Sequence, residues 1–291
     1  MARDAVIGGL RRMWVTTRVT ARVVDPRHRP LPHIVVIGAQ RSGTTSLYEL
    51  LAGHPQVRPP VRKEIQFLSI RWERGLPWYR RHFPVLPDAS LRTCEASPYY
   101  LFHPSAPVRA AAALPDSKFI ALLREPSTRA ISHYVHNRVN GLEPLDFESA
   151  LAVEADRLDT DPFGRNHRLY SYVSRGLYAE QIRHWRDAVG DRLLVLLSDD
   201  LFHRPRQTFR QMQAFVGLDL WNPTDFPILS RHRHNLGDDL TPRLHRRLQE
   251  RFAAPNRELA ALIGRDLSEW SDGADVTPRA HVASDWIDEM G

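Results

Sequence analysis

The stretch from His33 to Gly53 restricts the possible folds more than any other part of this sequence. It begins with an apolar run, His33-Ile-Val-Val-Ile37, which indicates a strand. A glycine-flanked loop follows, from Gly38 to Gly43, and then a segment with helical spacing from about Thr44 to Ala52. A strand, a tight loop and a helix in this order form one unit of a parallel sheet, whose loops lie at its carboxyl edge.

Two further apolar runs have the composition of strands buried on both faces, Lys118-Phe-Ile-Ala-Leu-Leu123 and Arg192-Leu-Leu-Val-Leu-Leu197. A short strand is expected near 91–95, and helical patterns separate the strands. The predicted helices cover 62–72, 76–82, 126–138, 146–157, 176–189, 205–216 and 241–263. We therefore predict an α/β protein with a P-loop-like parallel β-sheet, flanked by helices on both faces, in a single domain.

The predicted domain spans 33–270, between a basic N-terminal segment at 1–32 and a C-terminal tail at 271–291. The formal charge of +6 lies almost entirely in residues 1–32, where seven arginines and two aspartates give +5. Residues 1–25 read as an amphipathic helix, which fits either a capping helix or weak peripheral contact with an anionic membrane. Because no nucleic-acid-binding motif accompanies the arginines, we expect no nucleic-acid partner, and arginine-rich nucleic-acid binding is a minor alternative.

Cysteine and histidine usage bears on compartment and metal binding. The single cysteine, Cys94, excludes an intrachain disulfide and a Cys-rich zinc site. No apolar run is long enough to span a bilayer, and no signal-peptide core follows the early arginines. The pair His232-x-His234 lies in a basic segment and indicates solvated side chains rather than metal ligands. We expect a cytoplasmic protein that requires no metal.

The loop that follows the first strand is suited to bind an anion. Backbone N–H groups of such a loop and of the following helix can cradle phosphate oxygens. The pattern G-x-x-x-x-G-K-[ST] is matched except that Thr44 stands in place of the lysine, and Arg41 supplies a cation within the loop. Ordinary ATP or GTP hydrolysis is therefore not expected, although a P-loop kinase with an altered loop is an alternative.

The end of a second predicted strand is also suited to bind an anion. Arg124 follows the predicted strand 118–123, and Ser132 lies early in the next helix. An arginine and a hydroxyl at this edge could bind a second phosphate. The alternative is a surface ion pair between Arg124 and Glu125.

In combination, these motifs resemble the sulfotransferases that use 3′-phosphoadenosine-5′-phosphosulfate (PAPS), especially the heparan-sulfate glucosaminyl sulfotransferases and their bacterial relatives. Gly38-Ala-Gln-Arg-Ser-Gly-Thr-Thr45 is similar to the 5′-phosphosulfate loop of that family, and 123–132 to its 3′-phosphate motif. Three further segments fall in the family's order: Lys63-Glu-Ile-Gln-Phe67, Gly75-Leu-Pro-Trp-Tyr79 and Glu95-Ala-Ser-Pro-Tyr99. The resemblance covers about 33–270. It implies transfer of a sulfuryl group to a hydroxyl or amine of a carbohydrate, glycolipid or small metabolite.

The resemblance also implies roles for single residues. Glu64 would be the general base, because it follows Lys63 as the family's catalytic glutamate follows its lysine; His133 or His136 is the alternative base. The implied catalytic residues are Glu64, Arg41, Lys63 and His133. The implied donor ligands are Arg41, Ser42, Gly43, Thr44, Thr45, Ser46, Arg124, Ser132, Arg231 and Arg233, with Arg175 a weaker candidate.

One position departs from the family pattern. Family members often carry a lysine after the glutamate of the motif that begins here at Glu95, and this chain has Ala96. Either Lys63 or Arg41 would then supply the missing charge, or the acceptor differs from glucosamine.

Overall fold

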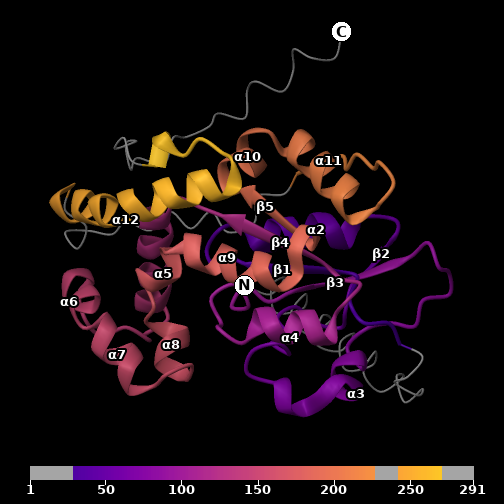
Figure 1. The fold of residues 1–291 in the computed structure, drawn as a ribbon, viewed down its shortest axis with the longest axis horizontal. Coiled ribbons are helices and arrows are strands. Elements are labelled where there is room, and N and C mark those ends of the chain that lie inside the picture. The colour runs from indigo at the N-terminus through magenta and orange to yellow at the C-terminus, as the bar shows by residue number, and fades with distance from the viewer. Residues whose placement is uncertain (1–28, 227–241, 271–291) are drawn as a thin grey trace, which may run out of the picture.

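The computed structural model describes residues 29–226 and 242–270. In this part of the chain, five parallel strands form one sheet in the order β2-β3-β1-β4-β5 (Figure 1). The strands are β1 (Ile34–Gly38), β2 (Val57–Arg58), β3 (Arg92–Ala96), β4 (Lys118–Leu123) and β5 (Leu193–Leu197). The predicted parallel α/β architecture is confirmed. The segment 1–25 and the tail 271–291 lie outside the described residues.

Helices connect the strands and continue after the last one. The helices are α2 (Thr44–Gly53), α3 (Gly75–Arg80), α4 (Ala106–Ala113), α5 (Pro126–Val139), α6 (Phe147–Ala152), α7 (Glu154–Thr160), α8 (Arg165–Leu169), α9 (Tyr178–Val189), α10 (Ser198–His203), α11 (Pro205–Val216) and α12 (Pro242–Ile263). Short 3₁₀ turns, η2 (Trp72–Arg74), η3 (Ser174–Gly176), η4 (Gly190–Arg192) and η6 (Ser268–Trp270), complete the description.

Both faces of the sheet are covered because successive side chains of a strand point to opposite sides. Val35 and Ile37 of β1 are fully buried on the face that packs against α4 and α9. Ile34 and Val36 are fully buried on the opposite face, against α2 and α11. This two-sided burial is the reason that β1 and β4 read as continuous apolar runs.

The chain order of the strands positions the functional edge. After β1 the chain moves to β2 and β3 on one side, and it then returns to β4 and β5 on the other side. The carboxyl ends of β1 and β4 are therefore neighbours at the point where the strand order reverses, which is where open α/β sheets bind ligands.

A lobe beside the sheet contains α6, α7 and α8, which Figure 1 shows grouped next to α5. Its apolar cluster joins α5, α6 and α12, with Tyr134, Phe147 and Phe252 buried at its centre. The predicted helix at 146–157 is in fact two helices, because the chain turns at Val153 between α6 and α7.

The predicted helix at 62–72 is wrong. Residues 62–71 form an irregular loop, and Glu64 and Gln66 have φ values of +59° and +62°, which no right-handed helix contains. The loop is held by contacts with distant parts of the chain. The Glu64 N–H donates to the Ala96 carbonyl over 3.0 Å, and the Arg109 guanidinium donates to the carbonyls of Leu68 and Ser69.

Two negative findings concern the described residues only. Between 29 and 226 and between 242 and 270, no helix is both long and apolar enough to cross a membrane. In the same part of the chain, no group of three or more His, Cys, Asp or Glu side chains is arranged to hold a metal ion. The pair His232 and His234 lies outside it.

Candidate active site

The loop between β1 and α2 presents backbone N–H groups at the carboxyl edge of the sheet. Gly43 is the N-cap of α2 with φ +88°, no side chain caps the helix, and its first turn contains no acidic residue. The first N–H groups of α2 are therefore open to an anion. Thr44 and Ser46 are buried in the first turn. The Ser42 carbonyl accepts a hydrogen bond from Ser198 Oγ of α10 over 2.6 Å, which attaches the loop to α10.

Gly43 is required by both its backbone conformation and its surroundings, which leads to a prediction. A Cβ at this position would lie 2.6 Å from Phe202 Cζ, whereas a Cβ at Gly141, also at positive φ, would meet nothing within 4 Å. The substitution Gly141→Ala is expected to cost about 1 kcal/mol of unfolding free energy from backbone strain alone. Gly43→Ala should cost about 2–3 kcal/mol and distort the anion loop. Thermal unfolding of both variants measures the difference; equal losses would contradict this account.

Arg41 joins the two predicted anion motifs. Its Nε donates to Ser132 Oγ of α5 over 3.1 Å, and its carbonyl accepts from Arg124 Nη1 over 3.2 Å. Arg41 itself has φ +71°, a conformation that a residue with a side chain adopts only when its surroundings hold it there. The loop after β1, the end of β4 and the first turns of α5 therefore form one site.

Glu125 does not form the surface ion pair with Arg124 that was the alternative to a phosphate site. It is the N-cap of α5, and its carboxylate accepts from the N–H groups of Ser127 and Thr128 over 2.8 Å and 2.6 Å. With Glu125 occupied by the helix terminus, the Arg124 guanidinium lies against the loop of Arg41.

A third arginine belongs to this cluster and was missed by the sequence reasoning. Arg129 of α5 is fully buried, donates to the Tyr172 carbonyl, and leaves its Nε and Nη1 without a hydrogen-bond partner. Burial lowers the pKa values of Arg41, Arg124 and Arg129, and the charges of the other two arginines lower that of Arg41 further. Arg41 and Arg124 are partly exposed, and their guanidinium groups, beside the buried charge of Arg129, are suited to a multiply charged anion. The sequence pointed to Arg129 only through its place within 123–132, the segment similar to the 3′-phosphate motif.

Arg175 is a structural anchor as well as a neighbour of this cluster. Its Nη2 donates to the carbonyls of His167 and Arg168 at the end of α8, and its Nη1 donates to Gln40 Oε1 in the anion loop. Burial and the charge of Arg129 lower the pKa of Arg175 to about 9. The weaker candidate of the sequence analysis thus ties the side lobe to the loop after β1.

Lys63 reaches the same edge from the loop 62–71, and Glu64 follows it in that loop. Lys63 Nζ donates to Thr45 Oγ1 over 2.6 Å, in the first turn of α2, and burial lowers the pKa of its ammonium group. Glu64 is exposed, as a group that exchanges protons with a substrate must be. Ala96 is fully buried in β3, and its carbonyl accepts a hydrogen bond from the Glu64 N–H.

His133, the alternative base, is placed differently. Its side chain is buried in α5 at 1% exposure, and its ring packs against that of Tyr172 with centroids 5.0 Å apart. Burial and the charges of Arg175, Arg129 and Arg41 hold its pKa well below the usual range. The ring is therefore neutral and inaccessible to a substrate, which disfavours His133 as the base. His136 is partly exposed and contacts Asn140. Arg231 and Arg233 lie outside the described residues.

Comparison with known proteins identifies the family. Residues 31–232 match the model of the sulfotransferase domain. The chain belongs to the sulfotransferase family. The crystal structure of a sulfotransferase from Alicyclobacillus acidocaldarius superposes on it with a TM-score of 0.71 and 30% identity, over 83% of this chain and 99% of that chain.

Two curated relatives of this sulfotransferase are human enzymes. It is 32% identical over 201 residues to heparan sulfate glucosamine 3-O-sulfotransferase 3A1, covering 68% of this chain and 47% of the relative. It is 31% identical over 265 residues to heparan sulfate glucosamine 3-O-sulfotransferase 6, covering 83% of this chain and 74% of the relative. The chain thus spans about half the length of the first relative.

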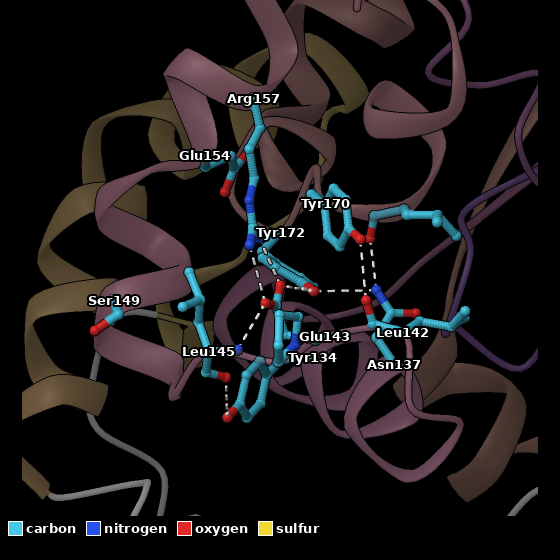
Figure 2. A network of polar contacts seen from close by, with 12 residues as sticks. Tyr134, Asn137, Leu142, Glu143, Leu145, Ser149, Glu154, Arg157, Tyr170 and Tyr172 are labelled. Carbon is cyan, nitrogen blue, oxygen red and sulfur yellow. Dashed lines mark hydrogen bonds and ion pairs between the residues drawn. The ribbon is translucent and has the colours of Figure 1, made fainter.

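A buried polar network joins the side lobe to α5 (Figure 2). The Glu143 carboxylate accepts hydrogen bonds from both Nη atoms of Arg157, over 2.6 Å and 3.1 Å, and from the Tyr172 hydroxyl over 2.8 Å. The hydroxyl of Tyr172 also accepts from Asn137 of α5 over 3.0 Å. Since the Tyr172 carbonyl is the acceptor for Arg129, this network supports the arginine cluster from behind.

The ion pair in this network predicts a pH-dependent stability. Burial alone would raise the pKa of Glu143, but the hydrogen bonds from Arg157, the Leu145 N–H and Tyr172 lower it below 4.5. A carboxyl whose pKa is lower in the folded state stabilises the fold above its unfolded pKa, and this contribution is lost as the pH falls through the folded pKa. Glu143→Gln should cost about 3 kcal/mol at pH 7. Thermal unfolding should show the gap between variant and wild type narrowing below pH 4.5; a constant gap would contradict this.

Proposed function

We propose that this chain transfers a sulfuryl group from PAPS to a hydroxyl or amine of a carbohydrate acceptor. The observation that carries the proposal is the 2.6 Å hydrogen bond from Lys63 to Thr45. It joins the loop that we assign to the phosphosulfate to the loop that contains the exposed Glu64. The proposed donor site and the proposed base therefore belong to two loops in contact.

The chemistry of the donor set fits the two anionic ends of PAPS. The open N–H groups at the start of α2, with Arg41, would hold the 5′-phosphosulfate. Arg124 and Ser132 would hold the 3′-phosphate, and the buried charge of Arg129 would add to the positive potential there. Planar guanidinium groups match phosphate and sulfate geometry, which explains why the cluster is built from arginine.

The transfer itself needs positioning and charge stabilisation more than covalent chemistry from the protein. As the acceptor oxygen or nitrogen forms its bond to sulfur, its proton passes to the Glu64 carboxylate. The bond between sulfur and the bridging oxygen breaks, and adenosine 3′,5′-bisphosphate leaves. Arg41 and Lys63 neutralise the charge that collects on the leaving phosphate.

A carbohydrate acceptor is supported by the names of the relatives, which are heparan sulfate glucosamine 3-O-sulfotransferases. The partly exposed rings of Trp72, Trp78 and Phe102 pack against Arg109, Arg71 and His167, so the acceptor class rests on the relatives alone.

Two measurements test the proposal. Adenosine 3′,5′-bisphosphate at millimolar concentration should raise the unfolding temperature by mass action, whereas ATP with magnesium should raise it less. Label from ³⁵S-PAPS should then pass to one member of a panel containing a heparan sulfate oligosaccharide, a glycolipid and a phenol. Stronger stabilisation by ATP with magnesium would favour the P-loop kinase alternative, and no stabilisation by either nucleotide would exclude both.

A further inference from the structure

A buried carboxylate that the proposed reaction does not use lies next to the loop of Glu64. Glu95, near the carboxyl end of β3, is fully buried. Its carboxylate accepts hydrogen bonds from three hydroxyl groups. Tyr79 of α3 donates to Oε2, while Ser97 and Tyr100 each donate to Oε1 over 2.7 Å. Three donors on one carboxylate fix the rotamers of all four side chains.

Ser97 connects this carboxylate to the loop. Its hydroxyl donates a hydrogen bond to Glu95 and accepts one from the N–H of Gln66 over 3.1 Å. The neighbouring Ala96 carbonyl accepts the N–H of Glu64 over 3.0 Å. Because a hydroxyl has one proton, the bond to Glu95 turns the lone pairs of Ser97 toward the loop.

The loop needs such an anchor because its backbone is strained. Glu64 and Gln66 both have positive φ, and each such residue costs about 1 kcal/mol or more unless the surroundings hold it. The two residues flank Ile65, which is fully buried. Releasing Gln66 from Ser97 would let the backbone relax and move the Glu64 side chain.

We propose that Glu95, acting through Ser97, is a positioning residue that holds the loop in the conformation that directs Glu64 toward the anion site. The hold on the loop conformation does not depend on which reaction the protein catalyses. The effect on turnover rests on the proposed function, in which Glu64 accepts the proton of the acceptor. The competing account is that Glu95 merely ties α3 to β3 and stabilises the fold as a whole.

The matched variants separate these accounts. Glu95→Gln keeps the shape but replaces one acceptor oxygen by an N–H₂ donor. Ser97→Ala removes the hydroxyl that bridges Glu95 and the Gln66 N–H, and leaves the direct interaction of that N–H with the carboxylate. Tyr79→Phe is the control, because its hydroxyl contacts Oε2, which Ser97 does not use, and its ring stays stacked on Phe67 at 4.2 Å. If Glu95→Gln fails to fold, Ser97→Ala decides the question.

Hydrogen exchange needs no acceptor and therefore tests the positioning independently of the chemistry. In Glu95→Gln and Ser97→Ala, the amides of 62–71 should exchange about 10-fold faster, while those of α5 stay at wild-type rates and adenosine 3′,5′-bisphosphate still raises the unfolding temperature. Uniform acceleration across the chain, or loop rates equal to those of Tyr79→Phe, would overturn the proposal.

Turnover supplies the second readout. With ³⁵S-PAPS and the panel acceptor that takes up most label, kcat should fall roughly 10- to 100-fold in both variants, with the KM for PAPS unchanged. The double variant should be no worse than either single one, because both remove the same link. Wild-type kcat in both variants, with Glu64→Gln inactive, would reject the positioning role and leave the proposed function standing.

Discussion

Replacing Glu64 by glutamine is expected to lower kcat by about 10²- to 10⁴-fold while leaving nucleotide binding intact. The amide keeps the size of the side chain but cannot accept a proton from the acceptor. Glu64 is exposed and forms none of the contacts among Arg41, Arg124 and Ser132, so the donor site should be unaffected. Transfer of ³⁵S from PAPS and the thermal shift with adenosine 3′,5′-bisphosphate measure the two properties separately.

The matched control is Glu49→Gln. Glu49 is an exposed carboxylate on α2, and like Glu64 it contributes to the electrostatic environment of Lys63. If Glu64 acted only by tuning Lys63, the two variants should lose similar activity. Retained turnover in Glu64→Gln would remove Glu64 from the mechanism.

The second large effect is expected for Arg124→Ala, which should abolish the thermal shift with adenosine 3′,5′-bisphosphate. Hydrogen bonds to a charged group contribute about 1.5–3 kcal/mol each. Losing two of them at a phosphate predicts an affinity at least about 100-fold weaker. The variant also frees the Arg41 carbonyl, so the loop after β1 loses a partner.

Two further variants make this result specific. Arg183→Ala removes an exposed arginine of α9 whose ion-pair partner is Glu258 of α12 rather than a residue of the proposed donor site, and it should keep the full shift. Arg124→Lys preserves the charge but not the planar fork, and should give an intermediate shift. An undiminished shift in Arg124→Ala would show that the nucleotide binds elsewhere.

The local sequence predicts a helix or strand correctly where its own residues mark its ends. The strand 118–123 and the helix 205–216 match β4 and α11 at both ends, because an apolar run marks the former, and Pro205 and Gly217 bound the latter. The two-residue strand β2 carries no comparable signal, and α4, an alanine-rich helix, was not predicted.

The sequence predicted contacts between residues of neighbouring motifs and missed those that join distant segments. Arg41, Arg124 and Ser132 are brought together as their positions at two strand ends suggested. The loop of Glu64 was mistaken for a helix because its shape depends on Ser97, which is more than thirty positions away, and on Arg109. The same long-range pairing hid the buried roles of Arg129 and Glu95.

The two helices that begin at the functional edge differ in how their positive ends are neutralised. Helix α5 carries its own counter-ion, Glu125, whereas α2 begins at an uncapped Gly43. The start of α2 will therefore accept any small oxyanion that the solution offers, and inorganic sulfate or phosphate in a buffer will compete with the nucleotide. Apparent affinities for this protein will therefore depend on the choice of buffer, and chloride salts will give tighter values than sulfate or phosphate salts.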